Sequence, residues 1–377
     1  MLKVKKTLLI MILLILTLPT LMAAGEDIDS IYKGTLEDSG AQEPEEALPD
    51  YARELIDSIG LDLTDINSFD GAGEGILTAT LAIMSDGFKT PLKSLFLILS
   101  VILLHCVVTG VWGKSDVSPV AGYISALAIA AGALFPLVQL LSDTVNATSG
   151  ISKFMFSFVP VYAGIILAGG AAKTAGSFSG LLMGASQAVS ALINSFVVPF
   201  ISIFLSLSFA GGISEMKLEG LLSSIKKAAV WTLTLGLTLF CGVLGIQTTI
   251  TSAGDNLSLK TARFMAGSFL PVVGGAVGEA MGTVGSCIGV LRGAVGAYGV
   301  IGILAILLPI FLSLIAWRLV LIAGESSAEL FGADMVRGML KGIGSAVTIL
   351  IGLVIWTALL FIISLSVVMI AAGGARI

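Results

Sequence analysis

The sequence predicts an all-α, polytopic membrane protein with a parallel internal repeat, Pro/Gly-interrupted helices, and an N-terminal signal followed by an acidic extracytoplasmic segment. Of the 377 residues, 56% are hydrophobic and 12% are charged, which is far from the balance of a water-soluble domain. Apolar runs of about 20 residues recur along the chain, and a run of this length crosses a bilayer as a helix. Two similar segments, separated by about a third of the chain, indicate the repeat.

The N-terminus has the order of a secretory signal peptide, which we predict at residues 1–24. Three lysines among the first six residues precede an apolar run at residues 7–18, and small residues follow at 23–25. An uncleaved membrane anchor is the alternative. With the basic end inside the cell, either form carries the following segment to the exterior.

Residues 25–86 form the predicted acidic extracytoplasmic segment. Fifteen of the 25 acids and only two of the 20 bases lie between residues 24 and 74. A short amphipathic pattern from Tyr51 to Ile59 predicts a helix that ends near Gly60.

Residues 87–377 form the predicted multi-span membrane domain. The strongest spans are residues 92–111, 120–141, 228–250, 300–322 and 343–370. Stretches rich in glycine and serine lie between them, at residues 154–172, 178–210 and 264–291. The stretch at 178–210 is too long for one crossing and holds Asn194 and Pro199 near its middle. It predicts two helices, or one amphipathic helix and one span.

The repeat units cover about residues 115–220 and 228–337, and a final span at 343–370 begins a third copy. Residues 153–164 read KFMFSFVPVYAG and residues 263–275 read RFMAGSFLPVVGG, so that Phe, Met, Ser, Phe, Pro, Val and Gly recur in order. Interrupted apolar segments at matching positions of two repeats point to a site inside a membrane protein. Chance similarity between glycine-rich apolar stretches is the alternative.

The interrupted segments supply the candidate residues for a pathway or a helix break. A proline removes a backbone donor, a glycine allows close helix approach or a sharp turn, and a charge inside an apolar region is costly. The candidates are Pro160, Gly164, Arg263, Pro271, Gly274, Gly275, Glu279 and Arg292. A plain helix-packing role for the glycines is an equally good interpretation.

The two interrupted segments are expected to lie against each other in the interior of the protein. Interrupted helices need partners that cover their open backbone groups. We therefore expect Pro160 and Pro271 at similar depth in the interior, with Gly164 and Gly275 on facing surfaces. Glu279 is expected to pair with Arg292 or Arg263. Alternatively, Arg263 extends to the membrane interface and only Glu279 is buried.

The basic residues predict the topology. Lys114, the pair Lys226 and Lys227, and then Arg337 and Lys341 precede the three long spans that begin near residues 120, 228 and 343. Because basic loops stay in the cytoplasm, all three spans are expected to run outward. The acidic segment and the C-terminus would then lie outside.

Residues for enzymatic chemistry do not stand out. The three cysteines lack CxxC spacing, the single histidine, His105, lies in an apolar run, and no nucleotide-binding or hydrolase motif is present. We therefore expect no catalytic residues, no metal site, no cofactor and no nucleic-acid partner.

The chain resembles a known family. The signal-led acidic segment, the sequence KTARF at residues 260–264 and the sequence FLPVVGG at 269–275 are similar to stage III sporulation protein AE of endospore-forming bacteria. One departure is Gly278-Glu279-Ala280, where the family pattern is Ser-Asp-Ala. The resemblance implies no catalytic residues.

The resemblance also implies a location and partners. A member of this family would be a multi-pass protein of the mother-cell membrane that surrounds the forespore. It would belong to a channel-like complex with a secretion-type ATPase, ring-forming proteins and a forespore partner, and it would be needed for late forespore gene expression.

Three functional hypotheses follow. The chain could line a transport pathway within a channel complex, it could form a non-conducting membrane platform on which an ATPase and ring proteins assemble, or it could act as an autonomous secondary transporter. Water exposure between Phe264 and Leu291 would favour the first hypothesis.

Overall fold

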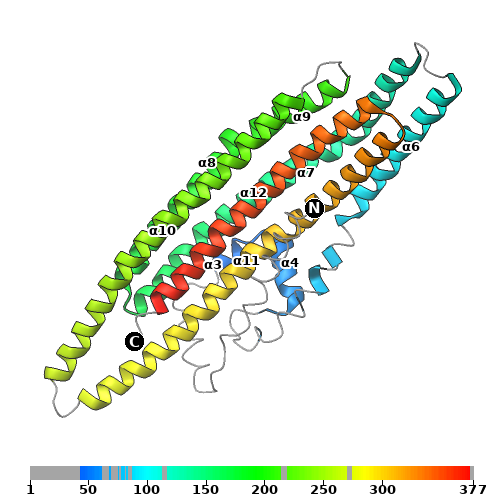
Figure 1. Ribbon diagram of the computed structural model, residues 1–377. Helices are drawn as coiled ribbons and strands as arrows, with labels where there is room; N and C mark the ends of the chain where they lie inside the picture. Colours follow the sequence, from blue (N-terminus) through cyan, green and yellow to red (C-terminus); the bar gives the residue numbers. More distant parts are fainter. Residues whose placement is uncertain are drawn as a thin grey trace.

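The protein forms an elongated bundle of long helices, seen here in a computed structural model (Figure 1). The structure describes residues 43–61, 87–112, 117–213, 219–269 and 274–373, with seven further positions between 68 and 83. For some of these residues, chiefly 262–269 and 274–287, it describes the backbone alone. The predicted signal at 1–24 lies outside these residues. The long elements are α6 (Lys89–Trp112), α7 (Val117–Ala168), α8 (Ala172–Leu192), a π-helical turn η3 (Ile193–Val197), α9 (Val198–Ile213), α10 (Glu219–Phe269), α11 (Gly274–Leu330) and α12 (Asp334–Gly373).

Within the described residues, six helical segments are long and apolar enough to cross a membrane. Five of them contain between 33 and 49 residues. At 1.5 Å per residue these segments measure about 50–75 Å, whereas the hydrocarbon core of a bilayer is about 30 Å thick. The bundle is therefore longer than a membrane is thick, and part of it extends beyond the hydrocarbon core.

The span expected at 120–141 and most of the glycine- and serine-rich stretch at 154–172 form one continuous helix, α7, so the interruption expected between them is absent. The stretch at 178–210 is likewise continuous through α8, η3 and α9, and a π-helical turn stands where the sequence predicted two helices. Inside a membrane each break would leave backbone N–H and C=O groups without partners, which favours continuous helices.

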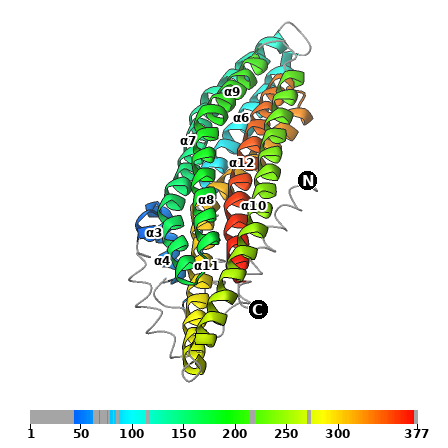
Figure 2. The same ribbon diagram turned by 90° about the vertical axis from the view of Figure 1, so that its left-hand side faces the viewer.

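The long helices alternate in direction. The starts of α7, α10 and α12 lie at the same end of the bundle as the ends of α6, α9 and α11 (Figures 1 and 2). Lys226, Lys227, Arg337 and Lys341 belong to the first turns of α10 and α12, so the basic residues gather toward this end. The helices α7, α10 and α12 therefore run in the same direction, as the predicted parallel repeat requires. Which end of the bundle faces the cytoplasm stays a prediction.

Helix α12 lies at the centre of the bundle. It packs against α7, α8, α9, α10 and α11. Its side chains at Leu353, Phe361, Leu365 and Val368 are fully buried. The axis of the bundle is therefore filled by apolar side chains.

The middle of the acidic segment packs onto the bundle through two short helices, α3 (Glu43–Glu46) against α7 and α4 (Asp50–Ile59) against α11. Helix α4 ends at Gly60, whose φ of 71° is the left-handed conformation that glycine accepts readily. This confirms the helix that the sequence predicted here.

Tyr51 attaches α4 to α11. Its hydroxyl donates a hydrogen bond to the carbonyl of Ile306 at 3.2 Å. Pro309 lies in the same turn of α11 and lacks the N–H that would bond the carbonyl of Ala305, the residue next to Ile306. Burial, and secondarily the charge of Asp143, raises the pKa of Tyr51 to about 12, so the donating hydroxyl stays protonated in neutral solution.

A contact between aromatic rings and glycines joins α7 to α11. Phe154, Phe158 and Tyr162 recur every four residues on one face of α7, and neighbouring rings stack with centroids 5.4 Å apart. The rings rest on three glycines of α11, Gly302, Gly299 and Gly296. A methyl group at Gly302 would lie 2.8 Å from Cζ of Phe154, and one at Gly299 would overlap the ring of Phe158. Close approach of the two helices therefore requires glycine here.

Replacing Gly299 with alanine should destabilise the bundle. The added methyl group overlaps the ring of Phe158, which is fully buried, and such overpacking costs about 1–3 kcal/mol. The measurement is thermal unfolding of the detergent-solubilised protein by circular dichroism. Gly293→Ala is the control in the same helix, because a methyl group there meets nothing within 4 Å. Equal melting temperatures of the two variants would contradict the contact.

Candidate functional site

Pro160 and Gly164 lie on the outer surface of α7 and do not face the interior. Helix α7 continues through Pro160, and both residues are exposed. A methyl group at Gly164 would meet nothing within 4 Å. The expected helix break and inward-facing surface are therefore wrong for these two residues. One missing N–H leaves the flanking helical hydrogen bonds intact, and the aromatic contact with α11 holds α7 straight on both sides of Pro160.

The second interrupted segment lies where α10 gives way to α11. Arg263 belongs to the last turns of α10, Gly274 and Gly275 begin α11, and Glu279 follows in its second turn. Pro271 lies outside the described residues. The structure does not describe the side chains of Arg263 and Glu279, so their pairing and the meeting of the two segments stay predictions.

Arg292 is the one charged candidate whose side chain the structure describes. It is half-buried on α11, and its charge acts on Tyr162 of α7. Tyr162 is two residues beyond Pro160. The structure therefore brings Arg292 close to the first interrupted segment, across the aromatic contact between the two helices.

Asp255 is a buried carboxylate of α10 that the sequence analysis did not single out. It is 3% exposed and accepts hydrogen bonds from the backbone N–H groups of Lys173 and Thr174, at 3.0 and 2.8 Å, and from the hydroxyl of Thr174. These N–H groups belong to the first turn of α8, which has no side-chain cap of its own. Asp255 therefore caps α8 from a neighbouring helix.

Gln247 extends the same polar contact along α10. Its side-chain amide donates to the carbonyl of Ser177 in α8 at 2.8 Å. The sequence holds one signal for the contact between α10 and α8. Asp255 is the only acid in the stretch from Thr248 to Ser258, which is rich in serine and threonine.

Two cations and one acid form a charged cluster near the basic end of the bundle. Lys226 of α10 interacts electrostatically with Arg318 and Glu325 of α11. Nη1 of Arg318 is buried and has no hydrogen-bond partner among the residues that the structure describes. A methyl group at Gly344 of α12 would lie 2.5 Å from this nitrogen, so glycine makes room for the guanidinium.

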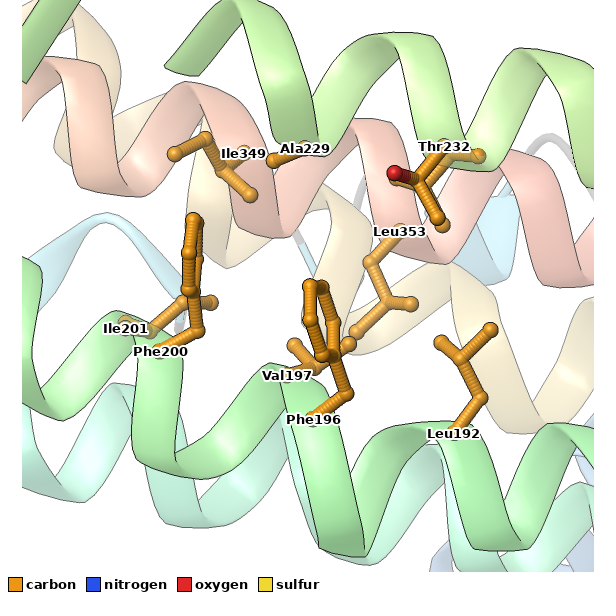
Figure 3. A pocket seen from close by; sticks show the side chains of 10 residues that line it. Leu192, Phe196, Val197, Phe200, Ile201, Ala229, Thr232, Ile349 and Leu353 are labelled. Carbon is orange, nitrogen blue, oxygen red and sulfur yellow. The ribbon is translucent and has the colours of Figure 1, made fainter. Parts of the chain in front are cut away.

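An apolar groove lies between the π-helical turn η3 with the start of α9 on one side and α10 and α12 on the other (Figure 3). The π-helical turn η3 forms one wall, with the N–H of Val198 donating to the carbonyl of Ile193 five residues earlier. Pro199 follows this turn directly, and π-helical turns are frequent at functional sites. The rings of Phe196 and Phe200 stack with centroids 5.2 Å apart. The lining residues are Leu192, Phe196, Val197, Phe200, Ile201, Ala229, Thr232, Leu233, Ile349 and Leu353.

No group of three metal-binding side chains occurs in the part of the chain that the structure describes. His105 is buried and shares a hydrogen bond of 3.3 Å, through Nδ1, with the hydroxyl of Ser125. This contact joins α6 to α7 and needs no ligand.

The fold and these sites define a polytopic, helical membrane protein. A family model described as stage III sporulation protein AE matches residues 60–373. The match covers most of the sequence, and the chain belongs to this family.

One relative, named stage III sporulation protein AE, comes from Bacillus subtilis (strain 168). It is 25% identical over 262 residues, which are 69% of this chain and 65% of the relative. The chain thus matches just under two thirds of the relative's length. No solved structure matches the chain.

Removing the carboxylate of Asp255 should weaken the contact between α10 and α8. Asp255→Ala leaves the first N–H groups of α8 buried without an acceptor, at a cost of about 1–3 kcal/mol. Thermal unfolding measures this loss. Asp143→Ala is the matched control, because Asp143 is exposed and its carboxylate accepts a hydrogen bond from Gln139 on its own helix. If the two variants unfold at the same temperature, Asp255 does not cap α8.

Proposed function

We propose that this chain is a multi-span component of the sporulation complex that connects the mother cell with the forespore, and that it lies in the mother-cell membrane around the forespore. Family membership and six apolar helices support this assignment. Within that complex we assign it the role of a non-conducting platform. A secretion-type ATPase would assemble at its basic, cytoplasmic end, and ring-forming proteins and a forespore partner at the opposite end.

The observation that carries the platform role is the central position of α12. A conduit along the bundle axis needs polar groups or space, and the axis is occupied by α12, whose fully buried hydroxyl groups are already satisfied. The hydroxyls of Thr357 and Ser364 are fully buried and donate to carbonyls of their own helix, those of Leu353 and Leu360. Helix α7 also lacks the break that a lining segment was expected to have.

A pathway between this chain and its neighbours is the second candidate. The outer faces of α7 and α8 expose polar side chains, among them Asn146, Lys153 and Gln187. These two helices pack side by side. A conduit formed between subunits would use such a surface.

Cysteine labelling separates a conduit through the bundle from a platform. In a variant without native cysteines, Thr357→Cys and Ser364→Cys should resist a water-soluble thiol reagent, because both positions are fully buried on the bundle axis. Glu54→Cys on α4, an exposed position outside the membrane-spanning helices, is the reactive control. Labelling of positions 357 and 364 at a rate close to that of 54 would contradict the platform role.

Deletion of the gene in the native host tests the sporulation role itself. Heat-resistant spores and late forespore gene expression should both be lost, and the wild-type chain should restore them. Undiminished spore formation after the deletion would overturn the assignment, whatever the labelling shows.

A further inference from the structure

Two neighbouring features, the charged cluster and the apolar groove, belong to one continuous surface. Lys226, Ala229 and Leu233 recur at the i, i+3 and i+7 positions of α10, which places them on one helix face. Ala229 and Leu233 line the groove, and Lys226 lies about one turn closer to the basic end. On α12, too, the charged cluster lies closer to the basic end than the groove does. Gly344 lies beside Arg318, and the groove residue Ile349 follows about 7.5 Å further along the helix.

The charged cluster has a surplus of positive charge and open donors. Neither Lys226 nor Arg318 forms an ion pair with Glu325, or with another acid, in the part of the chain that the structure describes. The neighbouring pair of Arg337 with Glu329, at 3.2 Å, shows that such contacts form nearby. A buried guanidinium nitrogen without an acceptor is costly, and an anion would remove that cost.

The groove adds an apolar half to this anion site. Phe196 is 44% exposed, so its stacked pair with Phe200 opens toward the outside of the bundle. The surrounding helices are membrane-spanning segments, and the outward side of such helices meets lipid chains. Free phosphate would fill the charged half and leave the apolar half empty.

We propose that this surface is a binding site for one anionic phospholipid. The phosphate of the headgroup lies between Lys226 and Arg318, and one acyl chain lies along Phe196 and Phe200. Basic pockets between transmembrane helices on the cytoplasmic side are suited to such headgroups, and the basic end of this bundle is the predicted cytoplasmic end. Bound lipid would join α10, α11 and α12, the three helices that surround the phosphate.

The test uses the full chain in a neutral detergent and measures its melting temperature during titration with phosphatidylglycerol. The lipid should stabilise the wild type with saturable dependence on its concentration. Lys226→Gln and Arg318→Gln should each raise the half-saturating lipid concentration about tenfold, the effect of losing one charge-assisted hydrogen bond. Lys227→Gln is the matched control and should leave the half-saturating lipid concentration unchanged. Lys227 is exposed and, as the next residue along α10, lies on a different face of the helix from Lys226.

Two further titrations decide the source of the phosphate. Phosphatidylcholine should stabilise much less, because its headgroup has no net charge and its choline group repels the two cations. Inorganic phosphate should have little effect below millimolar concentration, since it cannot fill the groove. Equal stabilisation by phosphatidylcholine, or an unchanged response of both Lys226→Gln and Arg318→Gln, would overturn the proposal. Full stabilisation by inorganic phosphate alone would replace the lipid with a free anion. The result does not depend on spore formation.

Discussion

The close contact between α7 and α11 is the constraint on which the rest of the bundle depends. Three stacked rings of α7 rest on three glycines of α11, and the absence of side chains at these glycines leaves the space that the rings occupy. Lipid gives no hydrophobic driving force for helix association, so packing of this kind has to supply the stability. With α7 and α11 fixed, α12 packs against both and becomes the central helix.

The remaining helices add to this centre through polar contacts as well as packing. Asp255 and Gln247 attach α10 to α8, and Tyr51 attaches the acidic segment to α11. Asp255 satisfies N–H donors that the start of α8 leaves open, and the other two contacts are hydrogen bonds between separate elements, which are most valuable away from water. A densely packed bundle with such attachments suits a platform on which other subunits assemble. A bound phospholipid beside α10 would stabilise the basic end in the same way.

Much of the fold could be predicted because long apolar runs have few alternatives in a membrane. The spans at 92–111, 228–250, 300–322 and 343–370 all lie within helices, and Gly60 correctly marked the end of α4. The break expected at Pro160 does not occur. Proline and glycine show where a helix can be interrupted, but the aromatic face of α7 and the glycines of α11 decide whether it is.

The candidate site was harder to predict because its residues come from separate helices. Arg318 and Lys226 lie 92 positions apart in the sequence, and neither belongs to a motif. Asp255 likewise gains its role from the start of α8, whose first turn lacks a cap. Such pairings depend on the helix register, which the sequence pattern alone does not specify.

The most direct test of the central contact is a double-mutant cycle between Phe158 and Gly299, measured as unfolding free energy in detergent. Phe158→Leu removes the ring that the methyl group of Gly299→Ala would overlap, so the double variant should be more stable than the sum of the single effects by on the order of 1 kcal/mol. Effects that add to within about 0.3 kcal/mol would contradict the contact and the bundle arrangement that depends on it.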